Sequence, residues 1–244
     1  MNKLFIIVVV AFSLISCMKK GDIDAQTIVD KSIAVSGGEK ITKSTIEFDF
    51  RNRHYKAIRN NDFFQFERVF QDSIHITRDV LSKNGFQRYI NKAPVKVSDS
   101  MGTRYSSSIN AVHYFAVLPF GLNDTAVNKQ YLKDVELKGN KYHKIKITFN
   151  QDGGGEDFED VFIYWIHTLT FKADFIAYSY SESDGLGLRF REAYNERYVN
   201  GIRFVDYNNY RPKENSVLLE RLDVLFENQK LQLLSKIELK NIKA

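Results

Sequence analysis

The chain has 244 residues, a formal net charge of +5 and a sequence pI near 9.0. Its lysines and arginines alternate with acidic residues along the whole chain, whereas nucleic-acid binding requires a clustered basic stripe, so we expect no nucleic-acid partner. Weak attraction to anionic lipid head groups is a more natural use of the surplus charge. With only three prolines, no internal repeat and no low-complexity tract, residues 25–244 suit a single domain.

The first seventeen residues predict export and lipid attachment. Lys3 precedes an apolar run, residues 4–15, that is too short to span a bilayer, which needs about 20 residues. Residues 1–16 are therefore typical of a signal peptide. Ser16 before Cys17 resembles the lipobox of bacterial lipoproteins, in which the cysteine is acylated, and residues 17–24 then form a lipidated tether. Cys17 is the only cysteine, so it forms no internal disulfide. The alternative is an ordinary secretory signal that ends in a chance cysteine.

A helix and then a series of strands are predicted next. Residues 24–35 predict the helix, because apolar side chains recur at helical spacing and Gly37 and Gly38 end it. Residues 44–53 alternate apolar and polar side chains, which is the pattern of a half-buried strand. Further strands separated by turn residues continue an antiparallel meander, over residues 63–70, 73–80 and 85–91.

A second helix, residues 105–118, interrupts the strands, with Tyr105, Ile109 and Val112 on one face. Asn200 and Gly201 form the strongest short hairpin signal in the chain. The remaining predicted strands cover residues 131–137, 141–150, 158–166, 188–199, 202–211, 217–226 and 231–242. Of these, residues 217–226 also suit a helix.

About ten or eleven antiparallel strands and two helices predict a mainly β protein of the α+β class. A sheet of that length normally curls to hide its edges, so we expect a large curled sheet that forms an unclosed β-barrel, with two or so short helices packed on or in it. The strand at residues 158–166 is apolar on both faces, which indicates that both are covered. One cover would be a helix, and the other a second part of the sheet or an apolar ligand.

These features resemble the unclosed half-barrel of periplasmic lipoprotein carriers and their outer-membrane acceptors, the LolA/LolB-like proteins, whose central strand is similar to Tyr164-Trp165-Ile166. Three short segments also resemble a family of uncharacterised bacterial outer-membrane lipoproteins with that fold, at residues 36–40, 112–119 and 201–204. The resemblance implies a concave apolar surface that holds acyl chains, with helices as a lid. His167 stands where such carriers usually place an aspartate, so a transfer function does not follow from the resemblance.

The sequence predicts no catalytic, metal or cofactor site. Residues 152–157, with Glu159 and Asp160, could offer oxygens to calcium, but they lack the spacing of an EF-hand and are more typical of a solvated loop. No Gly-x-Ser-x-Gly motif occurs, and Gly185 and Gly187 lack the third glycine of a dinucleotide fold. We therefore expect no enzyme. The five histidines also lack the spacing of zinc ligands: His54, His75, His113, His143 and His167.

Aromatic residues make up 14% of the chain, mainly as nineteen phenylalanines and thirteen tyrosines. They could line a lipid cavity or pack the core, and alternation alone does not say which face of the sheet is hollow. The candidates for a ligand cavity are Phe48, Phe50, Phe64, Phe66, Tyr114, Phe115, Trp165, Tyr178 and Phe190.

The favoured hypothesis is a lipid-anchored envelope protein, held at the periplasmic face of the outer membrane through acylated Cys17, that buries the acyl chain of a lipid or lipoprotein. Met18 does not resemble the acidic signal that retains some lipoproteins in the inner membrane. One alternative is a scaffold lipoprotein of an envelope complex that binds no ligand. Another is a hydrolase, supported only by scattered histidines such as His113. No sequence feature predicts an oligomeric state.

Overall fold

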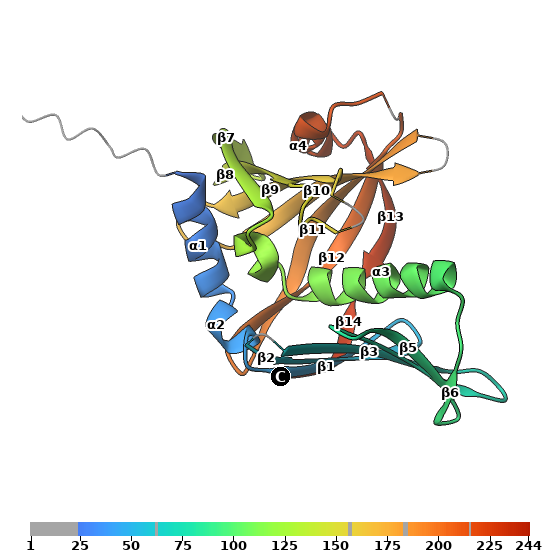
Figure 1. Ribbon diagram of the computed structural model, residues 1–244. Coiled ribbons are helices and arrows are strands. Elements are labelled where there is room, and N and C mark those ends of the chain that lie inside the picture. The colour runs from blue at the N-terminus through green and yellow to red at the C-terminus, as the bar shows by residue number, and fades with distance from the viewer. Residues whose placement is uncertain (1–23, 62, 156–157, 183–184, 215) are drawn as a thin grey trace, which may run out of the picture.

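The computed structural model describes residues 24–61, 63–155, 158–182, 185–214 and 216–244. The predicted signal peptide and Cys17 lie outside the described residues. Two seven-stranded antiparallel sheets form the framework, and neither closes on itself (Figure 1).

The first sheet contains, in spatial order, β14 (Leu239–Lys243), β1 (Thr45–Phe50), β2 (Arg53–Asn60), β3 (Phe63–Gln71), β4 (Ile76–Ser82), β5 (Gly85–Ile90) and β6 (Ala93–Val95). The second sheet contains β13 (Leu231–Ile237), β12 (Ile202–Pro212), β11 (Gly185–Val199), β10 (Ala173–Glu182), β9 (Val161–His167), β8 (Asn140–Phe149) and β7 (Val127–Leu137).

The two sheets are joined without a loop. Only Glu238 separates β13, which pairs with β12, from β14, which pairs with β1. The strands therefore form one curled surface with open edges at β6 and β7, which confirms the predicted unclosed half-barrel. Buried Asp206 stabilises the corner, because its carboxylate accepts hydrogen bonds from the Leu239 backbone N–H at 3.0 Å and from Arg197 Nη2 at 2.9 Å.

The helix α3 (Asp99–Ala116) and the 3-10 helix η1 (Phe120–Asn123) connect the two open edges. α3 crosses the interior above the inner face of the first sheet (Figure 1) and packs on β3, β4 and β5. Its buried side chains are Ile109 and His113. The helix begins six residues before the predicted start at residue 105, because its first turns carry few apolar side chains for a periodic pattern to detect.

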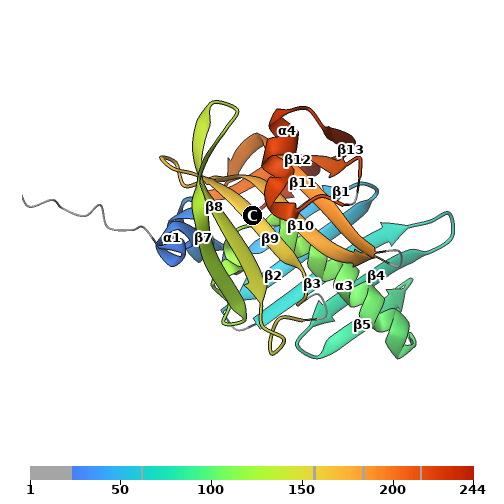
Figure 2. The ribbon, with the colours of Figure 1, turned by 90° about the horizontal axis from the view of Figure 1, so that it is seen from above.

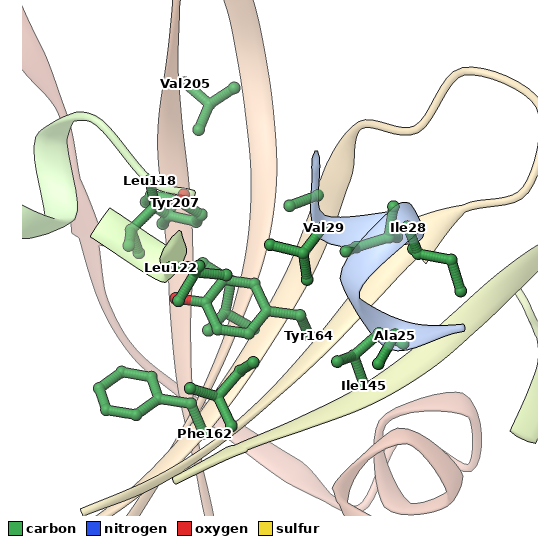
Figure 3. Close-up of a cluster of buried hydrophobic side chains, with 14 residues drawn as sticks. Ala25, Ile28, Val29, Leu118, Leu122, Ile145, Phe162, Tyr164, Val205 and Tyr207 are labelled. Carbon is green, nitrogen blue, oxygen red and sulfur yellow. The ribbon is translucent and has the colours of Figure 1, made fainter. Parts of the chain in front are cut away.

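The helix α1 (Ala25–Val35) confirms the first predicted helix, and Asp24 caps it by accepting a hydrogen bond from Thr27 N at 2.7 Å. Its buried face packs with η1 against the second sheet, where Ile28 and Val29 lie in the same cluster as Tyr164 (Figure 3). This contact covers the inner face of the second sheet beside α3.

The short helix α2 (Gly38–Ile41) follows at Gly37, which has φ +85° and faces Gly201 so closely that a Cβ there would collide with the Gly201 carbonyl oxygen. The neighbouring Ser36 carbonyl accepts a hydrogen bond from Arg203 N at 3.2 Å. Two of the three segments that carry the sequence resemblance, residues 36–40 and 201–204, are therefore in direct contact.

The prediction of a strand at residues 217–226 is wrong. The segment forms η2 (Leu219–Arg221) and α4 (Leu222–Glu227), which lie on the outer face of the second sheet (Figure 2). Leu219 and Leu222 are buried there, and the Phe226 ring stacks on Phe190 with centroids 4.8 Å apart. The helical spacing of these apolar residues decides the structure, because a single helix can bury them all against one sheet.

Candidate ligand-binding cavity

A mostly apolar cavity of about 270 Å³ lies beneath the C-terminal half of α3, at the corner where the chain passes between the sheets. Two cross-strand pairs flank the corner: Phe50 of β1 with Leu239 of β14, and Tyr207 of β12 with Ile237 of β13. All four residues line the cavity, and α3 covers it with Val112, Phe115 and Ala116.

A second hollow of about 410 Å³ lies next to the first. Ala111, Phe115 and Tyr178 border both hollows, and the rings of Phe115 and Tyr178 are 5.3 Å apart between centroids. The second hollow is more polar, because Ser106, Asn110 and Asp160 join aromatic residues in its lining. The two hollows are therefore neighbours that share lining residues from α3 and β10.

Arg191 of β11 contributes a charged group to the lining of the apolar cavity. The side chain is only 8% exposed, and its Nη2 donates a hydrogen bond to Tyr178 Oη at 2.7 Å. The guanidinium carbon lies 3.9 Å from the centroid of the Phe115 ring and 5.0 Å from that of Tyr178. Among the described residues, the buried Nε has no hydrogen-bond partner.

Four of the nine predicted cavity residues border a hollow: Phe50, Phe115 and Tyr178 line the apolar cavity, and Tyr114 lines the second hollow. The other three predicted phenylalanines of the first sheet border neither hollow: Phe48 is buried in the core, whereas Phe66 and Phe64 are half-buried. Phe66 stacks on His113 with centroids 4.7 Å apart, Phe48 packs on the same imidazole, and Phe64 contacts Phe66.

Trp165 and Phe190 lie on the opposite face of the second sheet from both hollows, so the structure corrects their predicted placement. They pack on each other and under α4. The reason is that the second sheet is apolar on both faces, and the outer face is covered by a helix that the sequence analysis treated as a strand. The side chains facing the cavity from β10 and β11 are instead Tyr178 and Arg191.

Sequence reasoning missed Val205, Tyr207, Ile237 and Leu239, although all four lie in predicted strands and face the interior. It also missed Arg191. Leu188 and Phe190 alternate with Arg189 and Arg191, a pattern that indicates an apolar inner face and a solvent-exposed outer face. The structure reverses this assignment, because α4 covers Leu188 and Phe190.

The histidine with the most buried surroundings, His113, does not line either hollow. Its Nε2 lies 3.1 Å from the Glu67 carbonyl oxygen, and burial lowers its pKa to about 3. Within the described part of the chain, no three His, Cys, Asp or Glu side chains gather at a metal-binding distance. Glu156 and Asp157 of the acidic loop lie outside the described residues. No helix among the described residues combines the length and apolar character needed to cross a membrane.

The fold and the cavity define a mainly β protein built as an unclosed half-barrel, with a helix across its interior and an apolar cavity beneath that helix. The chain belongs to the family described as "Family of unknown function (DUF6503)", whose model matches residues 2–239.

Solved structures with a similar fold share little sequence with this chain. A LolA superfamily protein from Nitrosomonas europaea has a TM-score of 0.49 and 11% identity, over 90% of this chain and 93% of that one. A candidate outer-membrane lipoprotein-sorting domain from Vibrio parahaemolyticus has a TM-score of 0.43 and 12% identity, over 76% and 85% of the two chains. A DUF1329 family protein from Desulfovibrio piger has a TM-score of 0.40 and 7% identity, over 90% and 92%. No curated protein matches the chain.

Proposed function

We propose that the protein binds the hydrocarbon part of a lipid, or another apolar ligand, in the cavity beneath α3. The observation that carries the proposal is an apolar hollow inside the half-barrel, lined by Val112 and Phe115 of the helix and by Phe50, Val205 and Ile237 of the sheets. Burial of hydrocarbon against such a lining stabilises the complex by about 25 cal/mol per Å² of apolar surface removed from water.

The helix α3 serves as the cover in this proposal. Contacts with the first sheet run along the helix. Arg88 lies 3.8 Å from the Tyr105 ring centroid, and Arg68 donates a hydrogen bond to Ser108 at 3.0 Å. Nearer the C-terminal end, the His113 ring stacks on Phe66 of β3. The C-terminal half lies over the cavity through Phe115 and Ala116. Entry and release of ligand then require this half, or the strands facing it, to move.

We also propose that acylated Cys17 anchors the protein to the outer membrane on its periplasmic face. The support is the apolar leader followed by Ser16 and Cys17. Several acyl chains hold a protein on a bilayer far more firmly than one chain does. Metabolic labelling with an alkynyl palmitate tests the anchor. The expected label is absent from Cys17→Ser, and an equally labelled variant would contradict it.

Native mass spectrometry tests the ligand proposal on the complete chain carrying Cys17→Ser, purified without harsh detergent. We expect an adduct of lipid mass. Ala116→Phe should abolish the adduct, because the larger side chain fills the cavity that Ala116 lines. Arg104→Phe is the matched control, since Arg104 is exposed on the same helix and borders neither hollow.

A protein that stays free of adduct, even after incubation with mixed phospholipids and fatty acids, would contradict the proposal. Capture of one stoichiometric protein partner by crosslinking in the envelope would then favour the scaffold alternative. Retention of the adduct in Ala116→Phe would place the ligand elsewhere on the protein.

A further inference from the structure

Arg191 is the only charged residue among the described residues that line the apolar cavity. A guanidinium carries five N–H donors and stays protonated in proteins. Here one donor reaches Tyr178 Oη, while the buried Nε reaches no acceptor on any residue that the structure describes. Within the described part of the chain, Arg191 forms no ion pair with a carboxylate.

The other two buried arginines of the described chain differ in this respect. Arg68 pairs with Asp79 at 2.7 Å, and Arg203 pairs with Glu196 at 2.6 Å and with Asp174 at 3.1 Å. Such pairing is the usual requirement for a buried charge, because burial without a partner is costly. Of these three arginines, only Arg191 has no carboxylate partner among the described residues, and it lines the apolar cavity.

Aromatic rings offset part of that cost. The guanidinium lies over Phe115 at 3.9 Å, Tyr178 at 5.0 Å and Tyr207 at 5.8 Å, all distances at which a cation is attracted to a ring face. Ring faces do not accept the in-plane hydrogen bonds of the guanidinium edge. The arrangement therefore holds the charge in place and leaves hydrogen-bonding capacity for an anion.

We propose that the cavity takes a single-chain amphiphile with an anionic head group, and that Arg191 binds this head group. The inference rests on the proposed function and adds the charge of the ligand's head group and the number of its hydrocarbon chains. A carboxylate matches the planar guanidinium and forms charge-assisted hydrogen bonds with it. A single chain follows from the cavity volume of about 270 Å³, which is just below the range of about 300–1,000 Å³ typical of ligand pockets.

Binding of four probes tests this ligand class. Dodecanoate, dodecyl phosphate, dodecanol and acetate are titrated by calorimetry into the complete chain carrying Cys17→Ser, in a nonionic detergent below its critical micelle concentration. We expect dodecanoate to bind at least about ten-fold more tightly than dodecanol, because a hydrogen bond to a charged group contributes about 1.5–3 kcal/mol. Acetate should bind far more weakly, because it lacks the chain. Dodecyl phosphate shows whether the head-group site also accepts a phosphate.

Arg191→Met should reduce the preference for dodecanoate over dodecanol to about two-fold or less. Arg189→Met is the matched control, because Arg189 lies two residues away on the same strand, contacts Tyr180 and does not line the cavity. Arg191→Lys is a second variant that keeps the charge without the planar fork, and we expect it to retain part of the preference. Cooperative unfolding of each variant verifies that it is folded.

Three results would overturn the inference: equal affinity for dodecanoate and dodecanol in the parent chain, a preference that survives in Arg191→Met, or acetate binding as tightly as dodecanoate. In the first two cases dodecanol still binds, so the proposed apolar function stands and only the head-group site fails. If neither twelve-carbon probe binds, the proposed function fails together with the inference.

Discussion

His113 lies at the centre of an aromatic cluster on the inner face of the first sheet. Its ring stacks on Phe66 at 4.7 Å and meets Phe48 and Tyr55 edge-on at 5.8 and 5.6 Å. Burial disfavours the charged imidazolium, and the nearby Arg59 acts in the same direction, so the pKa of His113 falls from 6.5 to about 3. The folded protein therefore needs this imidazole neutral.

This lowered pKa predicts a loss of stability in acid. The unfolded chain takes up a proton at His113 below about pH 6.5, whereas the folded chain does so only near pH 3, so the stabilisation is complete above pH 6.5 and is lost as the pH falls through this window. One such group lowers the free energy of unfolding by about 2 kcal/mol between pH 7 and pH 5.

Urea unfolding of the parent chain and of His113→Phe at these two pH values measures the contribution. The phenylalanine keeps the ring packing and removes the titration, so its free energy of unfolding should change less with pH. Carboxylates titrate equally in both chains and cancel in the comparison. An identical pH dependence in the two proteins would contradict a neutral, buried His113.

The attachment of α4 to the second sheet depends on a buried cluster on the outer face of that sheet. Lys144 Nζ of β8 lies 2.6 Å from Asp223 Oδ2 of α4, and the Trp165 indole N–H donates to the same oxygen at 3.1 Å. All three side chains are buried. A helix of only six residues gains little from its own hydrogen bonds, so tertiary contacts of this kind hold it in place.

Removal of the Asp223 carboxylate should therefore lower the stability of the protein. Asp223→Ala leaves the buried ammonium of Lys144 without its ion partner, and we expect the free energy of unfolding to fall by about 3–5 kcal/mol. The matched control is Glu220→Ala, which removes the more exposed pair with Lys146 and should cost less than about 1 kcal/mol. Urea unfolding followed by fluorescence of the single tryptophan, Trp165, measures both variants. Equal losses of unfolding free energy in the two variants would contradict a larger contribution from the buried ion pair.

The sequence predicts well the strands that have one solvent-exposed face and those that lie beside a strong turn signal. β1 lies within the predicted strand at residues 44–53, and the hairpin of β11 and β12 forms around Asn200 and Gly201 as expected. β10 was not predicted: Phe175 and Ala177 face α4, whereas Ile176 and Tyr178 face the interior. β9 is also apolar on both faces but was predicted, because its run of large apolar residues is continuous, whereas alanines and serines interrupt the run in β10.

Across the whole molecule, the half-barrel was predictable from the number of strands, but the position of the cavity was not. Alternation divides residues such as Phe190 and Arg191 between two faces without saying which face is internal. That choice depends on α4, a helix far along the chain that covers Phe190. The cavity also depends on the corner at Glu238, where one predicted strand divides between two sheets.

This shared corner predicts that the two sheets unfold together, as a single domain over residues 25–244 requires. Phe48 lies in β1 of the first sheet and is 1% exposed, so Phe48→Ala should lower the free energy of unfolding by about 3–5 kcal/mol through the lost contacts and the residual space. Trp165 reports on the outer face of the other sheet, beneath α4. If the molecule is one cooperative unit, the Trp165 fluorescence transition and the far-ultraviolet circular dichroism transition of the variant move to the same lower urea concentration. If each sheet folds on its own core, the fluorescence midpoint stays at its parental value while the circular dichroism signal divides into two steps, and the single-domain prediction fails.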